Sequence, residues 1–152
     1  MLHRALLPIA VAVAILLGHA AIAAAPIHTC VVTPPFTTFK PPLPLQPAPS
    51  GMFWYGAPML WTQLRADGSA ARRDKSWWWH PGFDGRVESH PDLQVAAIER
   101  FSNIRIGAPR ATNALLPDGW AMLTMLDFPM AGCWDVAATY QGASVIYVVT
   151  VN

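Results

Sequence analysis

The residues best suited to chemistry lie in one block, in which three consecutive tryptophans precede a polar loop. The candidate ligand-binding residues are Trp77, Trp78, Trp79, Asp84, Arg86 and Glu88. On a strand, Trp77 and Trp79 share a face and Trp78 points to the other, so burying one face leaves one or two indoles near solvent. Exposed indoles can stack on sugar rings, with the loop side chains binding hydroxyl groups. The favoured alternative is that the tryptophans fill the core of a small domain with few charges.

The same loop contains histidines and carboxylates that could suggest a metal site or acid–base catalysis. Zinc needs three or four ligands that converge at about 2 Å, but prolines and glycines make this loop irregular. Asp84 and Glu88 could form a carboxylate pair, although such spacing arises often by chance. The chain has no G-x-S-x-G, H-E-x-x-H or phosphate-binding glycine motif. We expect no catalysis, metal or cofactor; a small metal-assisted hydrolase built on His80, Glu88 and His90 is the least favoured alternative.

The first 25 residues have the pattern of a secretory signal. A short charged start, 1–4, precedes an apolar run, 5–17, and small residues continue to Ala25, with an A-x-A site at 21–23. The apolar run is short for a membrane span, so a retained anchor is the less favoured interpretation. The sequence therefore predicts a secreted or periplasmic protein with no stable transmembrane segment after cleavage.

Charge gives no indication of a nucleic-acid partner. Loss of Arg4 with the signal leaves nine basic and nine acidic side chains. A basic cluster, Arg65, Arg72, Arg73 and Lys75, is interrupted by acidic residues and is best interpreted as a solvated loop. The partner classes left open are a cell-envelope protein and a polysaccharide.

Two cysteines in an exported chain most simply form one disulfide. Cys30 and Cys133 would close a loop of about 100 residues, for which the chain-entropy model gives roughly 4 to 5 kcal/mol. The alternative is a lipid-attachment role for Cys30, although the residues before it lack the usual small side chain. Seven of the sixteen residues in 34–49 are proline, which favours an extended segment. With both ends tied to the domain, this segment should lie on its surface as a strap, rather than form a stalk.

Strand-like runs separated by Gly and Pro turns fill the rest of the chain. The predicted strands are 51–55, 58–64, 75–79, 93–101 with a possible extension through 103–106, 120–126, 133–140 and 143–151. The last two alternate clearly and are joined by Gln141–Gly142, which indicates a closing hairpin. We predict an all-β, immunoglobulin-like antiparallel sandwich of about seven strands over 51–152. A signal peptide, 1–25, and a Cys- and Pro-rich extended segment, 26–50, precede it.

Four segments, 53–64, 75–93, 111–123 and 127–151, resemble a family of uncharacterised exported bacterial proteins and lipoproteins. Members combine an early cysteine, a proline-rich stretch, an aromatic WWW-type block and a C-terminal GCW hairpin. The resemblance covers most of the chain after the signal. It implies an extracytoplasmic location and a single small β domain, but no catalytic residues. The expected function is an exported, non-catalytic binding or structural module of the cell envelope, with a carbohydrate-binding module as the first alternative.

Overall fold

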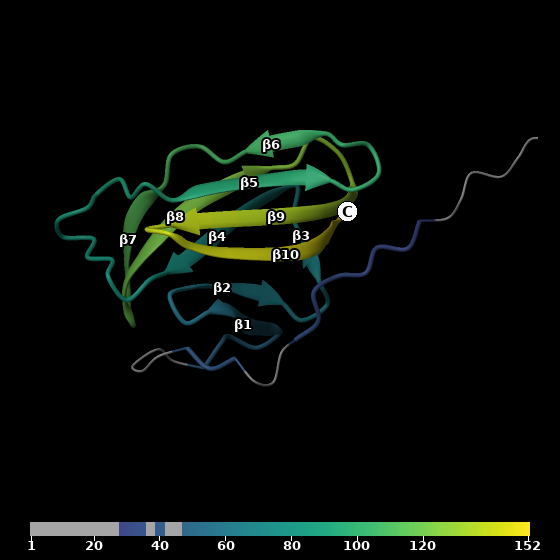
Figure 1. Ribbon diagram of the computed structural model, residues 1–152. Helices are drawn as coiled ribbons and strands as arrows, with labels where there is room; N and C mark the ends of the chain where they lie inside the picture. The colour runs from purple at the N-terminus through teal and green to yellow at the C-terminus, as the bar shows by residue number, and fades with distance from the viewer. Residues whose placement is uncertain (1–27, 36–38, 42–46) are drawn as a thin grey trace, which may run out of the picture.

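The computed structural model describes residues 28–35, 39–41 and 47–152, so the predicted signal peptide lies outside the described residues. Two five-stranded sheets pack face to face as a β-sandwich, which confirms the predicted fold class (Figure 1). The described residues contain no apolar helix of transmembrane length.

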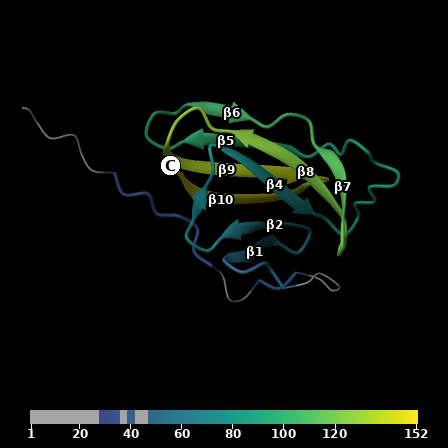
Figure 2. The same ribbon diagram turned by 180° about the vertical axis from the view of Figure 1, so that it is seen from behind.

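The two sheets are formed by strands that interleave along the chain. Sheet A contains, in spatial order, β1 (Met52–Ala57), β2 (Leu60–Arg65), β4 (Arg73–Trp79), β8 (Gly119–Asp127) and β7 (Thr112–Leu116). Sheet B contains β3 (Ser69–Ala70), β10 (Ala143–Val151), β9 (Gly132–Tyr140), β5 (Gln94–Glu99) and β6 (Arg105–Gly107). Sheet B faces the viewer in Figure 1, and the view from behind in Figure 2 brings β8, β4 and β7 of sheet A forward.

The closing hairpin, β9–β10, forms as the alternation predicts. Trp134, Val136 and Ala138 are buried in the core between the sheets. Gln141 and Gly142 both have positive φ, at 46° and 81°, as two-residue turns that match strand twist require. The core beneath this hairpin also holds Trp78 and Met122 of sheet A, both fully buried.

The described chain contains ten strands rather than the predicted seven or so, and three of them account for the correction. β3 and β7 were not predicted, since two residues carry no periodicity and the run Thr112–Leu116 is rich in residues with weak β propensity. Residues 105–107 do not extend the preceding strand but fold back as β6, antiparallel to β5. β3 pairs parallel with β10, so sheet B is mixed rather than purely antiparallel.

The predicted disulfide between Cys30 and Cys133 is present, with the two Cα atoms 5.4 Å apart. In immunoglobulin domains the disulfide packs in the core beside a tryptophan. Here the disulfide lies outside the core that contains Trp134. Trp134 points into the core, so Cys133, one residue before it on β9, points to the outer face of sheet B. The disulfide therefore fastens the entering chain to the outside of the sandwich.

Candidate functional site

The tryptophan block does not form an exposed platform. Trp78 is fully buried between the sheets, and Trp79 is buried on the opposite face of β4. Trp77 is half-buried on the same outer face as Trp79. Among the described residues, the indole N–H groups of Trp78 and Trp79 have no hydrogen-bond partner, although a buried indole N–H usually has one, so both rings contribute apolar packing only.

The outer face of sheet A carries a second apolar cluster, which we call the covered face. Its buried members are Trp54, Trp61, Trp79 and Ala121. The rings of Trp54 and Trp79 meet edge to face with centroids 4.8 Å apart. Phe39 and Ala48 of the proline-rich segment pack against the cluster. The described parts of that segment therefore lie on the domain, as the strap interpretation predicted.

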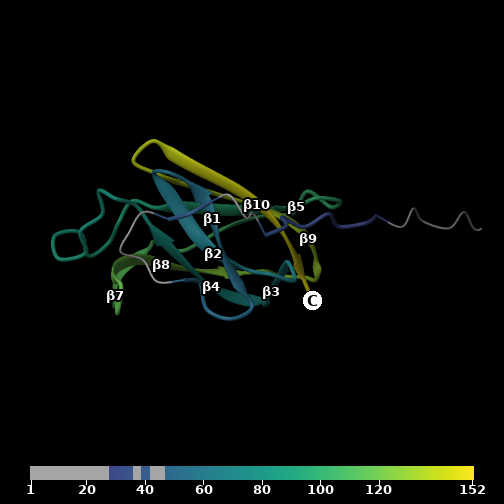
Figure 3. The ribbon, with the colours of Figure 1, turned by 90° about the horizontal axis from the view of Figure 1, so that it is seen from below.

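The loop between β4 and β5 (residues 80–93) projects from the end of the sandwich away from the C-terminus (Figure 3). The Oδ1 atom of Asp84 accepts a hydrogen bond from the amide of Arg86 at 2.9 Å, and the Asp84 carbonyl accepts from the amides of Val87 and Glu88. Asp84 thus shapes a turn, and the Arg86 side chain is exposed. The structure does not gather these side chains around an open indole.

Glu88 holds this loop to the sandwich, and His80 holds the first turn of the loop. The Tyr140 hydroxyl donates to Glu88 Oε2 at 2.5 Å, and burial, followed by this hydrogen bond and the Glu88 charge, raises the pKa of Tyr140. The amide of Gly82 donates to His80 Nδ1 at 2.9 Å. Burial lowers the pKa of His80, with the Glu88 charge opposing it, so the ring favours its neutral form. No group of three or more His, Cys, Asp or Glu side chains in the described ranges could hold a metal ion.

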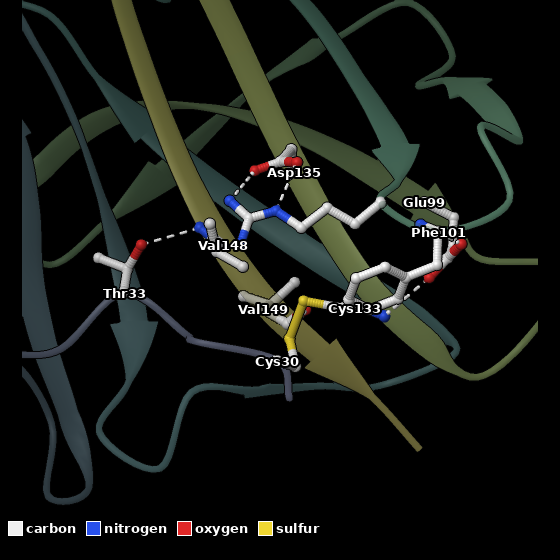
Figure 4. The surroundings of a disulfide bond; sticks show 9 residues. Cys30, Thr33, Glu99, Phe101, Cys133, Asp135, Val148 and Val149 are labelled. Carbon is white, nitrogen blue, oxygen red and sulfur yellow. Dashed lines mark hydrogen bonds and ion pairs between the residues drawn. A yellow bond between two sulfur atoms is a disulfide. The ribbon is translucent and has the colours of Figure 1, made fainter. Parts of the chain in front are cut away.

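The entering segment protects the open edge of β10, and Figure 4 shows it beside the disulfide. The backbone amide of Thr33 donates a hydrogen bond to the carbonyl of Val148 at 3.0 Å. The backbone amide of Val148 in turn donates to the hydroxyl oxygen of Thr33 at 2.8 Å. The Tyr55 hydroxyl donates to the Ile146 carbonyl at 2.7 Å. These contacts use edge groups that could otherwise pair with another chain.

Next to the disulfide, a buried carboxylate organises the turn after β5. Glu99 accepts hydrogen bonds from the amides of Phe101, Ser102 and Cys133, at 2.9, 2.6 and 3.2 Å. Burial by itself would raise the pKa of Glu99, but these hydrogen bonds together outweigh it, and the pKa is lowered. The neighbouring Arg100 binds both carboxylate oxygens of Asp135, at 2.8 and 2.9 Å.

An open groove with a mainly apolar lining lies on the outer face of sheet B. Strand register places Gly107, Ala96, Ala137 and Ile146 side by side on β6, β5, β9 and β10. The first three have the smallest side chains available, so a furrow crosses the strands there, and Ile146 closes its far end. We call this furrow the sheet B groove. Its cavity measures about 410 Å³, within the usual ligand-site range of about 300–1,000 Å³.

One rim of the sheet B groove carries charged side chains. This rim is the neighbouring row of residues across the sheet, Arg105, Ile98 and Asp135. The charge of Asp135 is neutralised by Arg100, whereas the exposed Arg105 has no ion-pair partner among the described side chains. The groove therefore combines an apolar floor with one available cation.

A smaller cavity lies where sheet A splits. β2 and β4 pair at two positions only, Trp61 with Trp79 and Thr62 with Trp78, and then diverge. The gap leaves a cavity of about 50 Å³, room for about three water molecules. Arg65 and Asp74, which line it, form an ion pair at 3.0 Å. This space is too small for a sugar ring or an acyl chain.

Sequence reasoning did not identify the sheet B groove. The signal was partly visible, because the alternation in 93–101 already places Ala96 and Ile98 on the face opposite Val95 and Ala97. The small outward residue Ala96 becomes part of a furrow only through its register with Ala137 on β9 and Gly107 on β6. That register depends on tertiary pairing, which the separate runs do not specify.

No family model matches this chain, and the searches of curated proteins and of solved structures found no significant match. The resemblance to exported bacterial proteins therefore remains an expectation from the sequence.

Proposed function

We propose that this protein is an exported, non-catalytic binding module of the cell envelope, and that its ligand site is the sheet B groove. The observation that carries the proposal is the row of Gly107, Ala96 and Ala137, which leaves an open apolar furrow on an otherwise well-packed sheet. Small side chains that face solvent in register on three strands do not add to core packing, and they admit a narrow ligand.

The chemistry of the groove favours an anionic amphiphile with a single acyl chain. The floor and the far end offer methyl groups of Ala96, Ala137 and Ile146, which suit a hydrocarbon tail. Two strand spacings separate β6 from β9, about 10 Å, which suits a chain of medium length. Arg105 lies two residues from Gly107 on β6, so a carboxylate near the β6 end would meet its guanidinium.

The carbohydrate-binding alternative has less support. It requires indoles that face solvent, whereas Trp78 and Trp79 are buried and Trp77 packs beside the covered face. Trp120, the other half-buried indole, lies against Gly85 so closely that a Cβ there would come within 2.3 Å of its ring.

Titration calorimetry with decanoate tests the proposal. The parent should bind decanoate, and Ala137→Trp, which fills the floor of the groove, should abolish the binding. Arg105→Gln should weaken decanoate by about tenfold, the effect of one charge-assisted hydrogen bond, and should leave decanol unchanged.

The matched control is Leu115→Trp, at an exposed strand position of β7 on sheet A and outside the groove, which should bind decanoate like the parent. Absence of decanoate binding by the parent, or equal loss in both tryptophan variants, contradicts the proposal.

A further inference from the structure

A small open pocket, which we call the basic pocket, lies on the outer side of sheet A beside the start of β7. Leu123 and Met125 of β8 form its floor, and Lys75, Arg110 and Thr112 stand around it. The three strands involved are neighbours in the sheet, with β8 between β4 and β7 (Figure 2). The cavity measures about 180 Å³, which is smaller than a drug-sized site of about 300–1,000 Å³ and suits a small ligand.

Strand register places a cation on each side of Met125. Lys75 is the neighbour of Met125 on β4. The pairing of β7 with β8 starts at Thr112, so the same register carried two residues back along the chain sets Arg110 on the other side of Met125. Neighbouring strands are about 4.8 Å apart, and the two cationic residues are therefore roughly 10 Å apart at the backbone. Both long side chains can reach one ligand above Met125.

The core determines the direction of the Arg110 side chain. The carbonyl of Pro109 accepts a hydrogen bond from the hydroxyl of the buried Thr124 at 3.0 Å. On the other side, Ala111 is fully buried in the core. Because both neighbours are anchored, the exposed side chain of Arg110 is left beside the basic pocket.

A backbone donor faces the same place. The amide of Phe128 donates to the carbonyl of Arg72 at 2.8 Å, which fixes the alternation of hydrogen bonds between β4 and β8. By that alternation, Met125 turns its amide and carbonyl away from β4 and toward the segment before β7. The pairing of β7 with β8 goes no farther than Leu123, so no strand covers the Met125 amide on that side.

The positive charge of the basic pocket is not neutralised by the described side chains. The two carboxylates on β4 and β8, Asp74 and Asp127, are each bound by an arginine outside the pocket, at 3.0 and 2.9 Å. Lys75 and Arg110 form no ion pair with any described side chain. Two unpaired cations around one small cavity create a positive potential that attracts an anion.

We propose that the basic pocket binds a phosphate monoester. Such a group carries roughly 1.5 to 2 negative charges at pH 7, and its oxygens can bind the ammonium of Lys75, the guanidinium of Arg110 and the hydroxyl of Thr112 together. A carboxylate carries one charge and needs only one of these cations. Leu123 and Met125 offer apolar contact to the carbon chain of the ester. The proposal does not rest on the sheet B groove, which lies on the other sheet.

Titration calorimetry with n-butyl phosphate tests the proposal. The parent should bind it, and Lys75→Gln and Arg110→Gln should each weaken the binding by about tenfold, the effect of one charge-assisted hydrogen bond. Dimethyl phosphate, a monoanion, should bind at least about tenfold more weakly, because it cannot satisfy both cations. Inorganic phosphate lacks the alkyl chain and should also bind at least about fourfold more weakly.

The matched control is Arg72→Gln, which removes the same charge from an exposed side chain outside the basic pocket and should bind butyl phosphate like the parent. Arg105→Gln, in the sheet B groove, should also leave this binding unchanged. The proposal is overturned if the parent does not bind butyl phosphate, or if Arg72→Gln loses as much affinity as the pocket variants. Equal affinity for dimethyl phosphate or inorganic phosphate also overturns it.

Vesicles that contain phosphatidic acid distinguish the two sources of a phosphate monoester. Co-sedimentation of the parent that both Lys75→Gln and Arg110→Gln weaken would place the monoester on a lipid. Binding of butyl phosphate without co-sedimentation would place it on a soluble ligand. Either result supports the basic pocket as the site.

Discussion

The two outer faces of this sandwich have opposite sequence character and opposite exposure. The covered face on sheet A has the rings of Trp54, Trp61 and Trp79, yet the strap residues Phe39 and Ala48 pack over it. The outer face of sheet B has small or unremarkable side chains along its groove and stays open. The indoles that resemble a binding site most in sequence are thus buried, whereas the open groove consists of residues with no obvious binding character.

The difference follows from what each face can bury. Indole rings have a large apolar area, and exposing this area to water is unfavourable. Covering the rings stabilises the domain by roughly 25 cal/mol per Å² of apolar area removed from water. Alanine and glycine offer little area, so nothing is gained by covering the sheet B groove. The disulfide, which ties the chain leading into the strap to sheet B, links the two faces.

Loss of the disulfide should have the largest effect on this contrast. Replacing Cys30 and Cys133 by serine removes a cross-link over 103 residues, and we expect a loss of about 4 to 5 kcal/mol in the free energy of unfolding. Urea denaturation of the double variant measures it, and the reduced parent should behave alike. A loss below about 1 kcal/mol would mean that the entering segment is held by its other contacts.

Removal of one indole from the covered face should come next. Trp79→Ala should cost about 3 kcal/mol, because it opens a cavity beneath the strap. Trp77→Ala, at the half-buried neighbour on the same face, is the matched control and should cost less. If Trp79→Ala is tolerated without loss of stability, the covered face is not a packed layer.

Glu99→Gln should cost about 2 kcal/mol at neutral pH, because a charged acceptor of three amides becomes a neutral one. The folded-state pKa of Glu99 lies below its unfolded value, so its contribution is present above the unfolded pKa and is lost as the pH falls through the folded pKa. The parent should therefore lose stability in this acidic range more steeply than the variant. Urea denaturation along a pH series checks this, and parallel profiles would contradict the role of Glu99.

The smallest expected change in stability comes from a comparison of the same substitution, Ala→Ser, on the two outer faces. Ala96→Ser, exposed on sheet B, should change the free energy of unfolding by less than about 0.5 kcal/mol. Ala121→Ser, fully buried in the covered face, should cost about 1 to 3 kcal/mol, because it places a hydroxyl in an apolar cluster. Equal costs at both positions would show that the faces do not differ in burial.

Much of the fold could be predicted from local patterns. The closing hairpin follows from the alternation around Trp134 and from the glycine at position 142, and the disulfide follows from two cysteines in a chain with a secretory pattern. The strand β7 was not predicted, because it forms through pairing with β8 and its own residues have weak β propensity. The outward position of Cys133 was implicit in the same alternation that places Trp134 inside.

The candidate site was harder to predict, for two physical reasons. Exposure of the tryptophans depends on whether the strap covers them, and the register of Gly107, Ala96 and Ala137 depends on pairing between strands far apart in sequence. Residue type alone gives neither. It favours large aromatic residues as ligand contacts and overlooks small ones.

The most direct test of the central contrast is to map decanoate on the domain by the chemical shifts of its backbone amides. We predict that titration shifts the amides of Ala96, Gly107 and Ala137 and leaves those of Trp77–Trp79 unchanged. Shifts concentrated at Trp77–Trp79, with the sheet B amides unmoved, would contradict the account and return the tryptophan block to the centre of function.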